Sequence, residues 1–301
     1  MFKQQISGIL NLSLPLIILY NIWPISIENI IGQIVCSLLL GAYVYYLGWV
    51  QMHKLQQNLQ YSPTGQYRDY FVHLLEECKV DPQVIILKYA YTSESTAMAV
   101  GNTVIIDPIA CHDLNNDPQA VAVQEIIKIH IIPHLSQSVK IRLEAIADIF
   151  TPAAQRFLFK HEVGHVMHHF SAKKLFVILT TTAIATFCAI QAALFAMQFH
   201  GAIAILVGMT VGWMMDIILT LLSNLVWKLG QEKQADAFAV EHSSDDDIVA
   251  AAEFFIQHQV IVDRYSELDI IMSHLPSVVR SGHQNGKVRA AYILQLMADK
   301  K

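Results

Sequence analysis

The residues best suited to chemistry stand at positions 161–165, in the order His-Glu-Val-Gly-His. Residues four apart share one face of a helix, so His161 and His165 can hold a single metal ion between them. Glu162, next to the first histidine, can then take a proton from a water molecule that the metal activates. The segment therefore predicts a metal-dependent hydrolytic site with Glu162 as the general base, and it requires a helix to run through these positions.

A catalytic zinc site usually has three protein ligands and one position left open for water. Glu232 is the candidate third ligand, and Asp236 follows four residues later on the same helix face. Asp236 is suited to hydrogen-bond a ligand histidine rather than to bind the metal itself. His168 is excluded as a ligand, because seven residues of helix place it about 10 Å along the axis from His161. The alternative for Glu232 and Asp236 is a solvated helix face.

The helix that carries the two histidines is predicted to begin at Thr151-Pro152 and to run to about residue 171. Short β-branched segments at 84–87 and 97–106 predict strands. The pair Gly101-Asn102 predicts a turn, which makes the second segment a hairpin or two edge strands. Further helices are predicted at 67–80, 118–132 and 139–149. The water-facing part of the chain is therefore expected to mix helices with a small sheet.

Composition predicts an integral membrane protein. The chain has 301 residues, of which 54% are hydrophobic and only 15% are charged, and its mean hydropathy is +0.40. Soluble proteins carry about 25% charged residues, so this chain has too little charge to cover a globule. Disorder and a disulfide scaffold are excluded by the same composition. A net charge of −5 and a pI near 6.2 give no support to nucleic-acid binding.

Four apolar stretches are long enough to cross the hydrocarbon core, which takes about 20 helical residues. The first is the weakest, since it contains two Asn and one Pro. The last two are separated only by His200-Gly201 and therefore predict a transmembrane hairpin. A buried core helix is the alternative for each stretch. The predicted spans are residues 6–23, 30–50, 175–199 and 202–227.

The positive charges predict the orientation of these spans. All 20 Lys and Arg lie before the first span, between the second and third, or after the fourth. The positive-inside rule places those segments in the cytoplasm, so both termini and the predicted catalytic parts are expected on the cytoplasmic side of the inner or plasma membrane. The four cysteines show no CxxC spacing, which agrees with a reducing compartment and no disulfides.

The order of the motifs resembles that of a known family. HEVGH at 161–165, a membrane hairpin and then Glu-x-x-Ala-Asp at 232–236 are similar to the HtpX-like membrane zinc metalloproteases, relatives of the CaaX prenyl endopeptidase. The resemblance extends to the layout of the whole chain. It implies that His161, His165 and Glu232 bind one Zn²⁺ per chain, with Glu162 as the general base. It also implies that Asp236 orients one of the ligands.

Two further elements of the family are matched less completely. The family has a His-Pro pair with an Arg six positions after the His; here His283 and Arg289 keep the spacing, but Gln284 replaces the Pro. The resemblance implies that His283 lies near the scissile carbonyl as a catalytic donor and that Arg289 supports the site. Residues 96–101 resemble a family stretch before the active-site helix, where an exposed strand can pair with an extended substrate backbone. The segment 107–159 is longer than is usual in the family, and its role, with those of His112, His130 and His134, stays unassigned.

Together these observations predict an integral membrane protein, mainly α with a small β-sheet. Four transmembrane helices would accompany a cytoplasmic α+β, zincin-like metalloprotease domain. The expected order is a two-helix membrane anchor, the catalytic part with the HExxH helix, the transmembrane hairpin, and the C-terminal catalytic part with the third zinc ligand. These four parts are residues 1–50, 51–174, 175–227 and 228–301.

The predicted function is that of a membrane-embedded zinc metalloendopeptidase. It would hydrolyse peptide bonds of membrane or misfolded proteins at the cytoplasmic face, with the bilayer and protein substrates as partners and no nucleic acid. The resemblance favours quality control of misfolded membrane proteins over prenyl-peptide processing, while the residues themselves leave both open. Two alternatives from other classes also remain: an inactive membrane scaffold or chaperone of the same fold, and a metal or proton transporter that uses Asp216 with Gln191 and His200.

Overall fold

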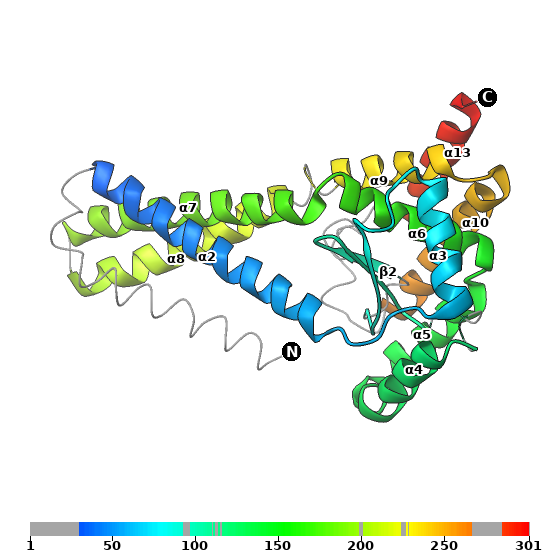
Figure 1. Cartoon of the computed structure of the whole chain (residues 1–301). Helices are drawn as coiled ribbons and strands as arrows, with labels where there is room; N and C mark the ends of the chain where they lie inside the picture. The colour runs from blue at the N-terminus through cyan, green and yellow to red at the C-terminus, as the bar shows by residue number, and fades with distance from the viewer. Residues whose placement is uncertain are drawn as a thin grey trace. The chain divides into compact units, whose positions relative to one another are not determined.

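The computed structural model describes most of the chain (Figure 1). The predicted first span at 6–23, His112, His200 and His283 lie outside the described residues. Two compact units are present, one within Met1–Gln51 and Lys173–Ser223 and the other within Met52–Ala172 and Asn224–Lys301. The described residues are 30–92, 97–109, 111, 114, 116–198, 201–223, 227, 229–266 and 285–300.

The first unit contains most of three long apolar helices, while the end of the first and the start of the second belong to the other unit. They are α2 (Ile30–Asn58), α7 (Phe170–Met197) and α8 (Gly201–Ser223). Each is long and apolar enough to cross a membrane, which suggests insertion into one. Large apolar side chains lie on their outer surfaces, and Trp213 is 68% exposed. Such exposure is costly in water and expected in lipid.

Small residues bring these helices into close contact. A Cβ atom on Gly41 would lie 2.7 Å from the carbonyl oxygen of Leu179, and one on Gly208 would lie 2.9 Å from the Cβ of Ala193. The side-chain amide of Gln191 in α7 donates to the side-chain oxygen of Gln33 in α2. Close backbone approach and a polar contact between helices are typical of packing within a membrane, where burial of apolar surface adds little.

A three-stranded sheet lies in the second unit, in the order β1-β3-β2. β1 (Ile86–Tyr89) runs parallel to β3 (Thr103–Ile106), and β2 (Ala97–Val100) runs antiparallel to it. The predicted hairpin is therefore confirmed. Gly101 provides its left-handed turn with φ of +62°, a conformation that side-chain-bearing residues rarely adopt. One edge of β2 is not paired with a strand of the described sheet.

Side-chain caps begin several of the helices around this sheet. Asp117 caps α4 (Pro118–His130), Ser136 caps α5 (Gln137–Ile149), and Thr151 caps α6 (Pro152–Met167) as predicted. Each cap accepts a hydrogen bond from a backbone N–H that would otherwise have no partner. The remaining elements are α3 (Gly65–Glu77), the 3₁₀ turn η2 (Ile132–His134), α9 (Leu229–His242), α10 (Asp245–Ser266) and α13 (Gly286–Asp299).

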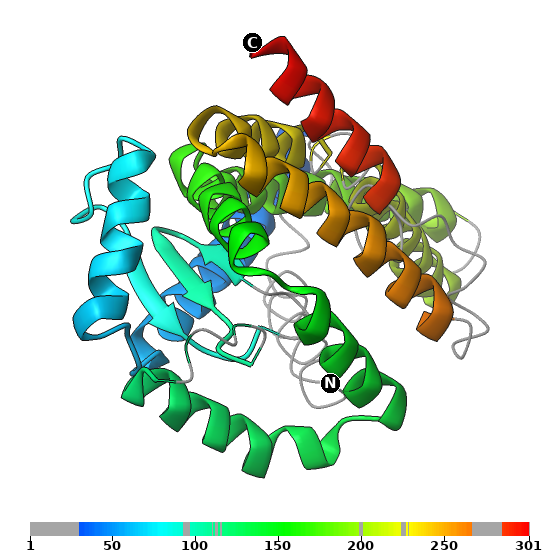
Figure 2. The same ribbon diagram turned by 90° about the vertical axis from the view of Figure 1, so that its right-hand side faces the viewer.

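The helix α6 forms the centre of this unit. It packs against α3, α9 and α10 and against β2 and β3, while α13 lies alongside α10 (Figure 2). It ends at Met167, earlier than predicted, because His169 adopts a left-handed conformation with φ of +54°. The long segment 107–159 supplies α4, η2 and α5, and α5 packs on α10. His130 and His134 are exposed on this segment, away from the buried core.

Candidate metal centre

The predicted metal ligands come from two helices that touch backbone to backbone. A Cβ atom on Gly164 of α6 would lie 3.0 Å from the Cα of Ala235 in α9 and 3.2 Å from its carbonyl oxygen. Any side chain at Gly164 would therefore hold the helices further apart. His161 and His165 flank Gly164, and Glu232 and Asp236 flank Ala235. The contact thus determines how near the four functional side chains can come.

Three candidate ligands gather in one buried cluster. The ligand atoms of His161, His165 and Glu232 all lie within 4.8 Å of one another. Nε2 of His161 is 3.5 Å from Oε2 of Glu232, and Nε2 of His165 is 3.6 Å from Oε1 of the same carboxylate. Two ligands bound to zinc at about 2.0–2.1 Å in tetrahedral geometry are about 3.4 Å apart. The donor set and its spacing therefore fit a zinc ion.

A second layer of contacts orients His161. Its Nδ1 is 2.8 Å from Oδ1 of Asp236, so an Nδ1–H donated there leaves Nε2 for the metal. Arg289 of α13 donates to both carboxylate oxygens of Asp236, from Nε at 2.9 Å and from Nη2 at 2.6 Å. Its guanidinium also lies over the ring of Phe255, 4.0 Å from the centroid. Arg289 thereby fixes Asp236, and Asp236 fixes the ring of His161.

Charges within the cluster set its protonation. Burial and Arg289 lower the pKa of His161, but Asp236 and Glu232 outweigh them and raise it to about 9. Burial and the neighbouring His161 lower the pKa of His165 to about 3. Burial alone would raise the pKa of Asp236, yet Arg289 and His161 hold it below its ordinary value. The raised pKa of His161 favours its charged form in the metal-free protein, in which Nε2 also carries a proton, and this second ring proton is the one that a metal must displace.

Glu162 lies between the metal ligands and the sheet. Its carboxylate accepts a hydrogen bond from the backbone N–H of Ala99 in β2. Burial raises the pKa of Glu162 to about 7, with His161 opposing this rise and Glu232 adding to it. A carboxylate that titrates near neutral pH can both accept and return a proton at that pH. The side chain is thus suited to the general-base role predicted for it.

The comparison with protein-family models agrees with this geometry. The model of Peptidase family M48 matches residues 129–285, just over half of the chain. The chain belongs to peptidase family M48. The matched range includes α6 and α9, and so the whole candidate cluster together with Glu162 and Asp236. The family consists of zinc-dependent metallopeptidases, which is the chemistry that the donor set fits. Comparisons with curated proteins and with solved structures found no match.

Most of the residues predicted for the site of this M48 chain lie close together in the structure. Their individual roles in metal binding and catalysis remain predictions. His161, Glu162, His165, Glu232, Asp236 and Arg289 are all present in one place. His168 is not among them, because its ring lies against Phe238 with the centroids 6.3 Å apart. His283 is outside the described residues. Phe170 was not predicted; its ring packs on that of His165 at 4.7 Å between centroids.

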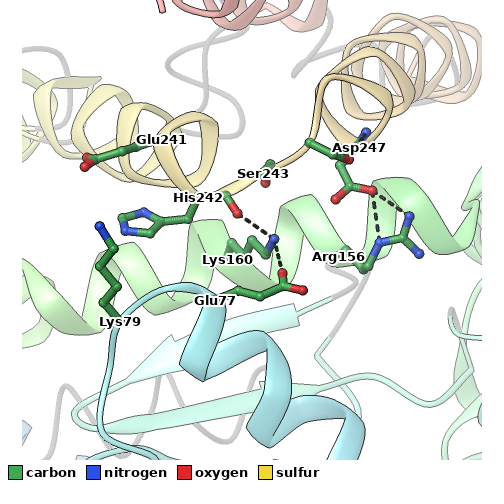
Figure 3. A pocket seen from close by; sticks show the side chains of 9 residues that line it. Glu77, Lys79, Arg156, Lys160, Glu241, His242, Ser243 and Asp247 are labelled. Carbon is green, nitrogen blue, oxygen red and sulfur yellow. Dashed lines mark hydrogen bonds and ion pairs between the residues drawn. The ribbon is translucent and has the colours of Figure 1, made fainter.

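A separate polar pocket of about 520 Å³ lies on another face of α6 (Figure 3). There Lys160, only 1% exposed, has its Nζ 2.6 Å from Oε2 of Glu77 and donates to the carbonyl oxygen of His242 at 2.6 Å. Arg156 pairs with Asp247 at 2.6 Å. The lining has three Asp or Glu residues and three Lys or Arg residues, besides His242. The buried Lys160 thus ties α6 to α3 and α9, and the half-buried Arg156 ties it to α10, a role that no local sequence signal for Lys160 revealed.

Proposed function

We propose that this M48 peptidase is an HtpX-like, membrane-embedded zinc endopeptidase that cleaves membrane or misfolded proteins at the cytoplasmic face of the membrane. The observation that carries the proposal is the buried cluster of His161, His165 and Glu232 with Glu162 beside it. Both a ligand set and a base are needed for hydrolysis, so their presence in one M48 site favours an active enzyme over a scaffold that has lost its chemistry.

The residues have distinct roles in this proposal. His161, His165 and Glu232 would hold zinc, which as a Lewis acid polarises a carbonyl group and lowers the pKa of a water molecule. Glu162 takes the proton from the attacking water and returns it to the leaving amine, and its pKa near 7 suits both transfers. Asp236 and Arg289 keep the ring of His161 in its ligand orientation. His283 remains the proposed donor to the oxyanion.

The edge strand β2 supports a peptide as the substrate. It lies at the edge of the sheet, packs against α6, and donates its Ala99 N–H to Glu162. An extended peptide that added to this edge would run past the proposed base, and its backbone would be recognised with little regard to side chains. Such recognition suits a peptidase that acts on unfolded segments of many proteins.

The proposed location and substrates rest on the apolar helices and on the charge distribution. Three helices are long enough to cross a membrane, and every Lys and Arg lies in segments that the positive-inside rule places in the cytoplasm. A site in those segments meets membrane proteins and unfolded proteins at the membrane surface. Cleavage of many unfolded substrates would favour quality control, whereas strict dependence on a prenylated C-terminus would favour prenyl-peptide processing.

The test is cleavage of an unfolded protein by detergent-purified wild type and by Glu162→Gln, with the zinc content of both measured. We expect wild type to cut, and the variant to keep its zinc but lose about 10²–10⁴-fold in rate, as for loss of a general base. Zinc binding without cleavage by wild type would favour the scaffold. Ion flux that depends on Asp216 and survives Glu162→Gln would favour the transporter. Gln191, which that alternative requires, is hydrogen-bonded to Gln33.

A further inference from the structure

The turn between β2 and β3 is held from two helices that are far apart in the sequence. Ser171, the second residue of α7, accepts a hydrogen bond at its Oγ from the backbone N–H of Gly101 at 2.8 Å. Gln56, in the last turn of α2, donates from Nε2 to the carbonyl oxygen of Val100 at 2.8 Å and to Oγ1 of Thr103 at 3.1 Å. The two side chains thus bind the hairpin at its turn and at both adjoining strand ends.

The fit at this turn is close. A Cβ atom on Gly101 would lie 2.5 Å from Nε2 of Gln56, nearer than two such atoms can approach. Gln56 thus lies directly against Gly101, and a side chain at position 101 would push the amide of Gln56 aside. β3 is also paired with β1, whereas β2 has four residues and pairs only with β3 within the described sheet, so these external hydrogen bonds help to fix where β2 lies.

The held strand leads directly to the candidate active site. Val100, which accepts the hydrogen bond from Gln56, is adjacent to Ala99, whose N–H donates to Glu162. Ser171 in turn is adjacent to Phe170, whose ring packs on the ligand His165. The start of α7 therefore contacts the hairpin through one residue and the metal cluster through the next. This arrangement fixes the edge of β2 relative to both Glu162 and His165.

We propose that Gln56 and Ser171 are positioning residues, which hold the edge of β2 at the distance from Glu162 that a bound peptide requires. This inference rests on the proposed function, in which β2 receives the substrate backbone. It adds that substrate affinity depends on the ends of two apolar helices, α2 and α7, that do not themselves touch the substrate. Loosening either contact would weaken binding of the peptide while leaving the metal ligands and Glu162 in place.

The test compares Gln56→Leu and Ser171→Ala with wild type in detergent, using an unfolded protein or an extended peptide as substrate. Loss of one hydrogen bond is expected to raise KM about 2- to 10-fold with kcat retained, because the backbone contacts are equal in the ground and transition states. The matched controls are Gln57→Leu, an exposed neighbour on α2, and Ser171→Thr, which keeps the hydroxyl. Both controls should show the KM of wild type.

A second measurement separates positioning from a loss of folded protein. In the zinc-loaded Glu162→Gln background, Kd for the peptide should rise by the same factor as KM. If a variant lowered kcat but left KM and Kd unchanged, it would merely have lost active protein. That result would overturn the positioning role of Gln56 and Ser171 but not the proposed function. If wild type neither cut nor bound the peptide, the proposed function itself would be wrong, and the inference would fall with it.

Discussion

The contact between α6 and α9 gives a sharp prediction for Gly164→Ala. The added methyl carbon would lie 3.0 Å from the Cα of Ala235 and 3.2 Å from its carbonyl oxygen. Carbon atoms in contact normally lie about 3.5–4.0 Å apart, so the two helices must separate by about 0.5 Å. Both neighbouring atoms belong to the backbone and cannot rotate away. The separation falls on the side of α6 where ligands from the two helices must meet at one metal ion.

The Gly164→Ala substitution should lower the affinity for zinc more than it lowers the stability of the metal-free fold. Zinc sites accept ligand distances only within about 0.2 Å, so the separated helices must be forced back together when the ion binds. Overpacking usually costs about 1–3 kcal/mol. When this strain is present only in the metal-bound state, it lowers the affinity for zinc about 5- to 150-fold. The metal-free protein should melt near the temperature of wild type, because Ala favours the helix by about 1 kcal/mol over Gly.

The assay is competition for zinc between the detergent-purified protein and a chelator of known affinity, with thermal unfolding of the metal-free form beside it. Gly230→Ala is the matched control, since Gly230 lies in α9 with nothing within 4 Å of an added Cβ atom. That variant should bind zinc as wild type does. If Gly164→Ala also bound zinc within twofold of wild type, the helix contact would not control the site, and the reasoning would be refuted.

Three further predictions concern protons and buried charges. Because zinc must displace the proton from His161, whose pKa is about 9, zinc affinity should fall about tenfold for each pH unit below that value; a flat profile in chelator competition would contradict this. Lys160→Met should lower the free energy of unfolding by about 1–3 kcal/mol, since it removes the hydrogen bond of a buried ammonium group and leaves the carbonyl oxygen of His242 without that donor. The exposed control Lys128→Met should change it by less than about 0.5 kcal/mol in the same denaturation assay. Burial raises the pKa of Asp107 to about 6, so stability should fall as pH rises from about 4 to 6, by about 3 kcal/mol in total. Asp107→Asn should remove that slope in melts across this range, and an unchanged slope would assign it to other groups.

Local signals predicted the parts of the fold that depend on a few neighbouring residues. Thr151-Pro152 does begin α6, and Gly101-Asn102 does form the turn between two strands. Both signals work because caps and tight turns are decided by the backbone within one or two peptide units. The end of α6 was predicted too late, since His169 is not a residue type that marks a left-handed turn as Gly would.

The candidate metal ligands could be predicted from the sequence, but the residues that hold the surrounding helices and strands in place could not. HEVGH places two imidazoles on one helix face, and the Glu232–Asp236 spacing repeats that arrangement on a second helix. By contrast, Gln56, Lys160 and Ser171 act through partners far away in the chain. No local pattern tells a buried Lys160 from a solvated one, because its partners Glu77 and His242 become neighbours only through the fold.

The order of elements along the chain also constrains how the site is assembled. α6 continues into α7 through the turn at His169, and α9 follows α8, so both apolar helices lie between His165 and Glu232 in the sequence. If α7 and α8 cross a membrane, the cluster of His165 and Glu232 requires them to return the chain to the side from which they left. An odd number of crossings would leave Glu232 on the opposite side from HEVGH, whereas two crossings bring both to one side. For helices that span a membrane, the pairing of His165 with Glu232 therefore requires an even number of crossings between them.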